Sequence, residues 1–156
     1  MSESIIFFIE GQAKGQPRPR AFARRMGSRF VARMYDDDAA DEWKAAVDGA
    51  VMEYLDGLKP EDKPYVVQML FYMERPAYMF TSKGDIKESF SRTRHTKKPD
   101  VDNLAKLVLD RITKSQRVWF DDSQVVHLLV SKQYADNQKI GAGVQIWEWR
   151  ENKCIG

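Results

Sequence analysis

The sequence predicts a single α+β domain in which a mixed β-sheet is flanked by two main helices. The chain has 156 residues, enough for one domain with a buried core, and 43% hydrophobic with 31% charged residues is typical of a soluble globular protein. Short apolar runs of strand length alternate with two longer segments whose apolar residues recur at three- and four-residue spacing. No internal repeat or linker divides residues 1–156, so we expect one domain.

The first half of the chain contains two expected strands and one expected helix. Residues 4–10 form a short apolar run that predicts the first strand. Residues 39–58 have helical periodicity, with Asp36, Asp37 and Asp38 as expected helix caps. The apolar stripe of this helix comprises Trp43, Ala46, Val47, Ala50, Val51, Tyr54 and Leu55. Residues 65–73 are so dense in apolar side chains that they predict a central strand.

The second half contains the other expected helix and the remaining strands. Its helix begins near Pro99, which the first turn tolerates, and its core side comprises Val101, Leu104, Ala105, Val108 and Ile112. Residues 118–120 are expected to form a short strand or the start of one. Residues 124–130 predict an interior strand in which His127 is packed or partnered, and residues 143–150 predict the last strand.

Two long segments, residues 11–35 and 75–98, are expected to be basic loops. Residues 12–34 carry seven lysines or arginines and no acid, and include a possible hairpin near Phe30. The planar guanidinium of arginine suits phosphate oxygens, so these segments are candidate DNA contacts. The candidates are Arg18, Arg20, Arg24, Arg25, Arg29, Arg92, Arg94, Lys97 and Lys98. The alternatives are a solvated basic loop for the first segment and plain disorder for the second, where His95 either contacts phosphate or is solvent-exposed.

An acidic pair stands at the start of the second helix. Asp100 and Asp102 fall at the positive end of the helix dipole. Because they are two residues apart, they can share a metal ion only if Asp100 precedes the first regular turn, as we assume. Lys106 and Asp110 follow Asp102 at four-residue steps and give the helix a continuous polar face.

A second acidic pair, Asp121 and Asp122, lies at the boundary of the expected interior strand. Carboxylates from a helix start and a strand boundary would form an oxygen cage of the kind that Mg²⁺ or Mn²⁺ prefers. The alternative is that these aspartates only cap a helix and turn a strand.

These residues together resemble a known family. The run Pro99-Asp100-Val101-Asp102-Asn103-Leu104, then Lys106 and Asp110, then Asp121-Asp122-Ser123-Gln124-Val125-Val126 with Lys132 after it, is similar to the RusA family of Holliday junction resolvases. The resemblance implies that Asp100, Asp102 and Asp122 are catalytic metal ligands and that Lys106 is the catalytic lysine. The link before Asp121 is a residue longer than in the bacterial prototype, so Asp121 is a possible substitute for Asp122.

The resemblance also implies a RusA-like fold, a homodimer, a Mg²⁺ requirement and four-way junction DNA as substrate, in a bacterial or phage-encoded protein. The expected activity is that of a crossover junction endodeoxyribonuclease in recombination and repair, with 5′-phosphate products. The alternatives are a metal-dependent nuclease of other branched or single-stranded DNA, and a non-catalytic DNA-binding module.

Several other classes of protein are not expected. Cys154 is the only cysteine, so there is no internal disulfide, which fits a reducing compartment. No segment approaches the roughly 20 apolar residues of a membrane span. There is no phosphate-cradling glycine motif, so we expect no nucleotide cofactor. The sequence therefore predicts a cytoplasmic protein.

Overall fold

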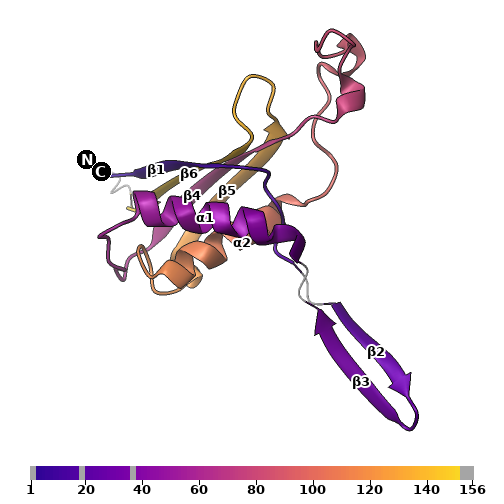
Figure 1. Cartoon of the computed structure of the whole chain (residues 1–156). Helices are drawn as coiled ribbons and strands as arrows, with labels where there is room; N and C mark the ends of the chain where they lie inside the picture. The colour runs from indigo at the N-terminus through magenta and orange to yellow at the C-terminus, as the bar shows by residue number, and fades with distance from the viewer. Residues whose placement is uncertain (1–2, 18–19, 36–37, 152–156) are drawn as a thin grey trace.

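A mixed four-stranded sheet forms the centre of the molecule (Figure 1). The computed structural model describes residues 3–17, 20–35 and 38–151, with the backbone only at residues 20–24 and 30–35. The sheet has the order β1 (Ile5–Glu10), β6 (Gly141–Glu148), β4 (Tyr65–Met73), β5 (Val125–Tyr134), and only the β4–β5 pair is parallel. The two main helices, α1 (Asp41–Tyr54) and α2 (Val101–Ser115), lie side by side over one face of the sheet. The predicted fold class is confirmed.

The core lies between the helices and the central strand β4. Alternate residues of β4 point to the helices, and Val67, Met69 and Phe71 are fully buried. Helix α2 buries Leu104, Ala105, Leu107, Val108, Leu109 and Ile112 against them. Val101, predicted on the core side, is 38% exposed because it is the first helical residue and lies outside the packed stripe.

Strand β5 lies at the edge of the sheet, so the prediction of an interior strand is wrong. It pairs with β4 on one side only, and its other edge is open. Three of its apolar residues are exposed: Val126 to 50%, Leu128 to 43% and Leu129 to 50%. His127 is exposed as well, with its ring 6.5 Å from that of Trp149, rather than packed in the core. The apolar run that suggested burial on both sides belongs instead to an unpaired edge.

Residues 118–120 form no strand, contrary to expectation. Val118 and Trp119 are buried, but their polar groups make isolated hydrogen bonds rather than the regular hydrogen-bond ladder of a β-sheet. The Val118 carbonyl accepts hydrogen bonds from the Tyr65 hydroxyl (3.0 Å) and from the Glu61 amide (3.1 Å). The Trp119 indole donates to Thr113 Oγ1 (2.7 Å). The bulk that suggested a strand therefore fills the core from a loop, while Phe120 faces solvent.

The start of α1 also differs from the prediction. Its N-cap is Ala40, with no side-chain cap, and Asp38 begins the short 3-10 turn η1 (Asp38–Ala40) before it. Asp36 and Asp37 lie outside the described residues. Tyr54, predicted on the apolar stripe, is about half exposed, although its ring stacks on Phe7 at 5.7 Å. The helix therefore packs mainly through its other apolar residues.

Two appendages leave the body of the molecule at the end where α2 begins (Figure 1). Strands β2 (Arg20–Met26) and β3 (Arg29–Tyr35) form an antiparallel hairpin, which confirms the expected hairpin in the first basic segment. Residues 74–100 form a long arm with two short 3-10 turns, η2 (Ala77–Met79) and η3 (Glu88–Phe90). Among the described helices, none combines the length and apolarity needed to cross a membrane.

Candidate active site

Asp100 and Asp102 stand at the N-terminus of α2. Asp100 is the N-cap residue, with extended backbone angles of φ −72° and ψ 150°, so it precedes the first regular turn as assumed. Its carbonyl accepts a hydrogen bond from the Leu104 amide, but its side chain makes no capping bond. Both carboxylates are exposed, and no described residue pairs with either of them. Capping therefore does not account for Asp100, and its carboxylate is available to a ligand.

The backbone that leads into Asp100 is held by a lysine from β5. The ammonium group of Lys132 donates to the Lys97 carbonyl (2.5 Å) and to the Pro99 carbonyl (2.8 Å). Each of these bonds has a charged donor and is therefore stronger than a neutral hydrogen bond. Lys132 thus fixes the backbone immediately before Asp100 to the end of the sheet.

The start of α2 is also tied to the segment that precedes the basic hairpin. The side-chain amide of Asn103 donates to the Gln16 backbone carbonyl (3.2 Å), and the Gln16 backbone amide donates to the Asn103 backbone carbonyl (3.1 Å). Gly15 permits this approach, because a Cβ at that position would lie 2.3 Å from the Asn103 side-chain nitrogen. The chain that leads to the hairpin is therefore docked beside Asp100.

A hollow of about 440 Å³ lies at this junction, between the 14–17 segment and the N-terminus of α2. Its lining includes Lys14, Lys98, Asp100 and Asn103. Two lysines beside a free carboxylate and a helix N-terminus can receive a phosphate group together with a cation.

Lys106 lies one helical turn beyond Asp102 on the polar face of α2. Its side chain is exposed and has no ion-pair partner within the described part of the chain. Arg111, further along α2, is instead paired with Asp48 of α1, and its guanidinium donates to both carboxylate oxygens. That carboxylate raises the pKa of Arg111. Lys106 is therefore available to bind a phosphate, whereas Arg111 joins the two helices.

The second acidic pair lies at the start of the 3-10 turn η4 (Asp122–Gln124), directly before β5: Asp121 is its N-cap and Asp122 its first residue. Asp121 caps this turn, since its carboxylate accepts a hydrogen bond from the Ser123 amide (2.8 Å). Hydrogen bonding by the side chain and the backbone of Ser123 lowers the pKa of Asp121. Asp122 is exposed and makes no side-chain bond to any described residue. Asp121 is therefore a capping residue, as in the alternative interpretation of the acidic pairs, whereas the carboxylate of Asp122 is free.

The two acidic pairs lie at opposite ends of α2. A helix of 15 residues spans roughly 22 Å at 1.5 Å per residue, and Asp122 follows its far end. Within the described residues, no group of three or more His, Cys, Asp or Glu side chains could hold one metal ion. The expectation that one chain gathers its carboxylates into a common cage is therefore wrong. The spacing in the sequence could not reveal this, because it does not specify how a helix is oriented between its flanking turns.

The predicted DNA-binding residues lie on the two appendages. Arg25 and Arg29 are exposed near the tip of the hairpin, and Arg92, Arg94, Lys97 and Lys98 are exposed on the arm. Arg20 and Arg24 belong to β2, but their side chains are not described, and Arg18 lies outside the described residues. Positive side chains thus flank the Asp100 end of the body.

The base of the arm is anchored by Arg75, which sequence reasoning missed. Its guanidinium is buried, donates to Asp136 Oδ1 (2.7 and 3.0 Å) and to the Phe90 carbonyl (3.0 Å), and stacks 4.5 Å from the Tyr134 ring centroid. His95 packs edge-on against the same ring at 5.0 Å, and burial together with the Lys132 cation lowers the pKa of His95. The arm is therefore packed on the end of the sheet, and His95 is neither fully exposed nor turned outward.

Lys132, Asn103 and Gly15 are the other positioning residues whose roles were not predicted. Asn103 and Lys132 belong to the motif that carried the resemblance, which was the one signal that could have identified them. Gly15 gives no signal in the sequence, since only the folded structure brings it against Asn103.

Comparison with known proteins identifies a matching family and a relative. A protein-family model described as "Endodeoxyribonuclease RusA" matches residues 10–146. An uncharacterized protein of Bacillus subtilis (strain 168), YqaN, is 31% identical over 143 residues, which cover 88% of this chain and 93% of that protein. The family match contains the hairpin, the arm and both acidic pairs.

Proposed function

The chain belongs to the RusA family of endodeoxyribonucleases, and on that premise we propose that it is a Mg²⁺-dependent enzyme that resolves four-way (Holliday) DNA junctions by paired symmetric nicks. The observation that supports this proposal most directly is the pair of free carboxylates at the start of α2, beside a lysine-lined hollow and between two basic appendages. Recombination and DNA repair are the processes in which this activity would act.

The chemistry of the donor set suits a hard divalent cation, although the described residues of one chain do not bring the three carboxylates together. Asp100, Asp102 and Asp122 offer carboxylate oxygens with no competing partner among the described residues, and such oxygens are the ligands that Mg²⁺ and Mn²⁺ prefer. When bound, Mg²⁺ supplies a Lewis acid for the scissile phosphate and lowers the pKa of the water that it binds. Asp121 is the weaker candidate, because its carboxylate is already used as a cap.

The lysines of the site would handle the negative charge of the reaction. Lys106 extends from the turn after Asp102 and would neutralise the charge that grows on the phosphorane or on the leaving oxygen. Lys14 and Lys98 line the hollow beside Asp100 and would hold the DNA backbone there. The expected products carry a 5′-phosphate and a 3′-hydroxyl, which leaves the nick ligatable.

A homodimer would bring the separated carboxylates together. Strand β5 offers an open edge with three exposed apolar residues, and such an edge readily pairs with another strand. If two copies of β5 pair antiparallel, the start of one strand lies beside the end of the other. Asp122 would then approach the partner subunit's Asp100 and Asp102, because Lys132 ties the end of β5 to the backbone before Asp100.

One register that would do this has its two-fold axis at His127. It would set Val126 opposite the partner's Leu128, and Asp122 level with the partner's Lys132. Each of the two composite sites would then serve one of the two equivalent strands of a four-way junction.

The dimer is tested by substitution on the β5 edge. We expect Leu128→Lys to convert the dimer into monomers in sedimentation velocity and to abolish cleavage. Ile6→Lys is the matched control, since Ile6 is 66% exposed on the opposite edge strand β1, and it should leave the dimer intact. A Leu128→Lys variant that remains dimeric would overturn the proposed interface.

The substrate is tested by comparing a mobile four-way junction, a fork and a linear duplex, each with and without Mg²⁺. The proposal predicts paired nicks in the junction only, and only with the metal ion. Preferential cutting of the fork would indicate a nuclease of another branched DNA. Binding without any nicking would indicate a DNA-binding module.

A further inference from the structure

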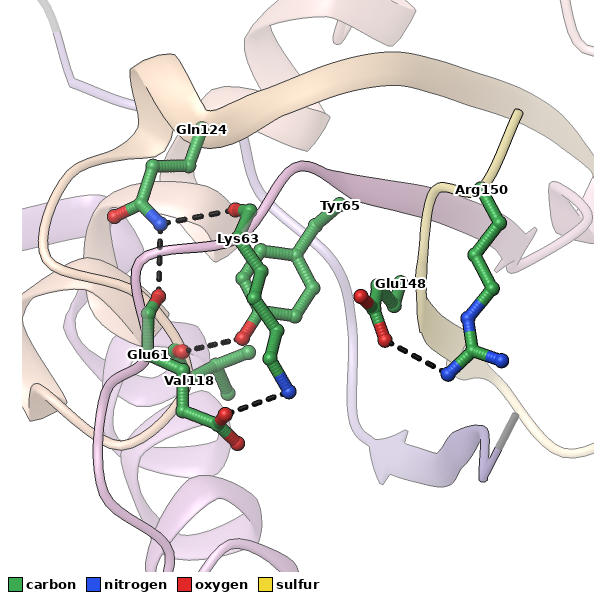
Figure 2. Close-up of polar contacts among 7 residues, drawn as sticks. All are labelled: Glu61, Lys63, Tyr65, Val118, Gln124, Glu148 and Arg150. Carbon is green, nitrogen blue, oxygen red and sulfur yellow. Dashed lines mark hydrogen bonds and ion pairs between the residues drawn. The ribbon is translucent and has the colours of Figure 1, made fainter.

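Gln124 joins two parts of the chain at the Asp122 end of α2 (Figure 2). Its side-chain nitrogen donates to the Glu61 carbonyl (2.8 Å) and to the Lys63 carbonyl (3.0 Å), both in the segment before β4. Its side-chain oxygen accepts from the Phe120 amide (2.8 Å) and from the Asp121 amide (3.3 Å). One side chain therefore connects the η4 turn to a segment more than sixty positions earlier.

These four bonds use the hydrogen-bonding capacity of the glutamine amide fully. A glutamine side chain has two N–H donors and one oxygen with two lone pairs, and each of these groups has a backbone partner here. A fully satisfied amide has no reason to change its rotamer. The position of the η4 turn is therefore fixed through Gln124.

Asp122 lies inside the turn that Gln124 holds. Two hydrogen bonds fix the preceding residue, Asp121: its carboxylate accepts from the Ser123 backbone amide, and its own backbone amide donates to the Gln124 side-chain oxygen. The Asp122 side chain makes no hydrogen bond or ion pair with any described residue, so its direction depends on the backbone on either side of it. The backbone upstream is fixed too, because the Val118 carbonyl accepts a hydrogen bond from the Tyr65 hydroxyl (Figure 2). The same carbonyl also accepts one from the Glu61 amide.

The ion pairs near this network contribute little to it. Lys63 pairs with Glu61 (2.6 Å) and Arg150 pairs with Glu148 (3.1 Å), but all four side chains are at least partly exposed (Figure 2). Exposed ion pairs typically contribute less than about 1 kcal/mol. Among the side chains drawn there, the Gln124 amide is therefore the main link between the η4 turn and the segment before β4.

We propose that Gln124 is a positioning residue, which holds the Asp122 carboxylate where it can complete the metal site. This inference rests on the proposed function, since it assigns Asp122 as a metal ligand. Removing a residue that orients a metal ligand typically lowers metal affinity by about 10- to 100-fold.

The experiment measures Mn²⁺ binding by the full-length protein without DNA, from the loss of the free Mn²⁺ signal in electron paramagnetic resonance. Gln124→Met keeps the length of the side chain and removes all four bonds. We expect it to weaken Mn²⁺ binding by about 10- to 100-fold, and to raise the Mg²⁺ concentration for half-maximal cleavage in parallel. Junction affinity in EDTA should be unchanged. Gln145→Met is the matched control, because Gln145 lies on the open face of the sheet and makes no side-chain hydrogen bond to any described residue.

A double-mutant comparison separates positioning from general structural damage. In an Asp122→Asn background, Gln124→Met should weaken Mn²⁺ binding no further, because the residue acts through Asp122. Equal losses in both backgrounds would overturn the inference. Should Gln124→Met not fold, Gln124→Asn carries the same test, since its amide is one methylene too short to bridge both segments.

The failure of this inference is distinguishable from the failure of the proposed function. If Asp122→Asn binds Mn²⁺ and cleaves junctions like the wild type, the proposed metal site is wrong. If Asp122→Asn is impaired but both Gln124 variants bind Mn²⁺ normally, only the role of Gln124 is wrong.

Discussion

Complementation between two inactive variants tests whether the active site is shared between subunits. Asp102→Asn removes a carboxylate at the start of α2, and Asp122→Asn removes one beyond its end. The helix between the two positions is roughly 22 Å long, whereas Mg²⁺ binds its ligands at about 2 Å, and within the described residues no cluster of three such ligands forms in one chain. Each variant alone should therefore be inactive.

A mixed dimer of these two variants would have one intact site. That site takes Asp102 from the subunit that carries Asp122→Asn, and Asp122 from the other subunit. Random mixing produces about half mixed dimers, each with one of its two sites intact, so about a quarter of the wild-type nicking capacity should return.

The assay is single-turnover nicking of a labelled four-way junction after the variants have been co-expressed with different affinity tags. The mixed dimer, purified through both tags, should nick one strand and leave the opposite strand uncut. A mixed dimer that forms and binds the junction but remains inactive would refute the shared site.

Three further predictions follow from the appendages. Asp136→Ala leaves the buried guanidinium of Arg75 without its carboxylate and should lower the free energy of unfolding by about 3 kcal/mol in urea titrations; a loss below about 1 kcal/mol would contradict the anchoring role. Replacing Arg25 and Arg29 together by glutamine should weaken junction binding and make the slope of log K against log salt shallower by about 1.8, whereas an unchanged slope would mean that the hairpin tip does not contact phosphate. Because the pKa of His95 is lowered in the folded state, the unfolded chain binds this proton first as the pH falls below about 6.5, and the free energy of unfolding decreases. His95→Phe should therefore lose less stability between about pH 7.5 and 5.5 than the wild type, and an equal loss would contradict this assignment.

Much of the fold could be predicted because its signals are local. The dense apolar run of β4 predicts a central strand and the apolar stripe of α2 predicts a helix, and the structure confirms both elements. The edge position of β5 was not predictable in this way. Its run of valine and leucine reads as an interior strand, and only the sheet order shows that one side is open.

In the candidate site, too, local features could be predicted from the sequence and long-range features could not. A helix start near Pro99 was predictable from the proline and the apolar stripe, whereas the placement of Asp100 before the first regular turn was an assumption that the structure bears out. The separation of Asp122 from Asp100 depends on where the chain goes after the helix, which no local pattern specifies. The anchors Arg75, Gln124 and Gly15 were missed for a related reason, since their partners lie far away in the sequence.

The most direct test of the central claim compares the wild-type protein with Asp102→Asn on a mobile four-way junction in Mg²⁺, with cleavage and junction binding measured on the same samples. We predict that the wild type makes paired nicks, and that the variant makes none while it binds the junction at least as tightly. Cleavage at the wild-type rate by Asp102→Asn would contradict the account, because the carboxylates at the start of α2 would then not take part in the reaction.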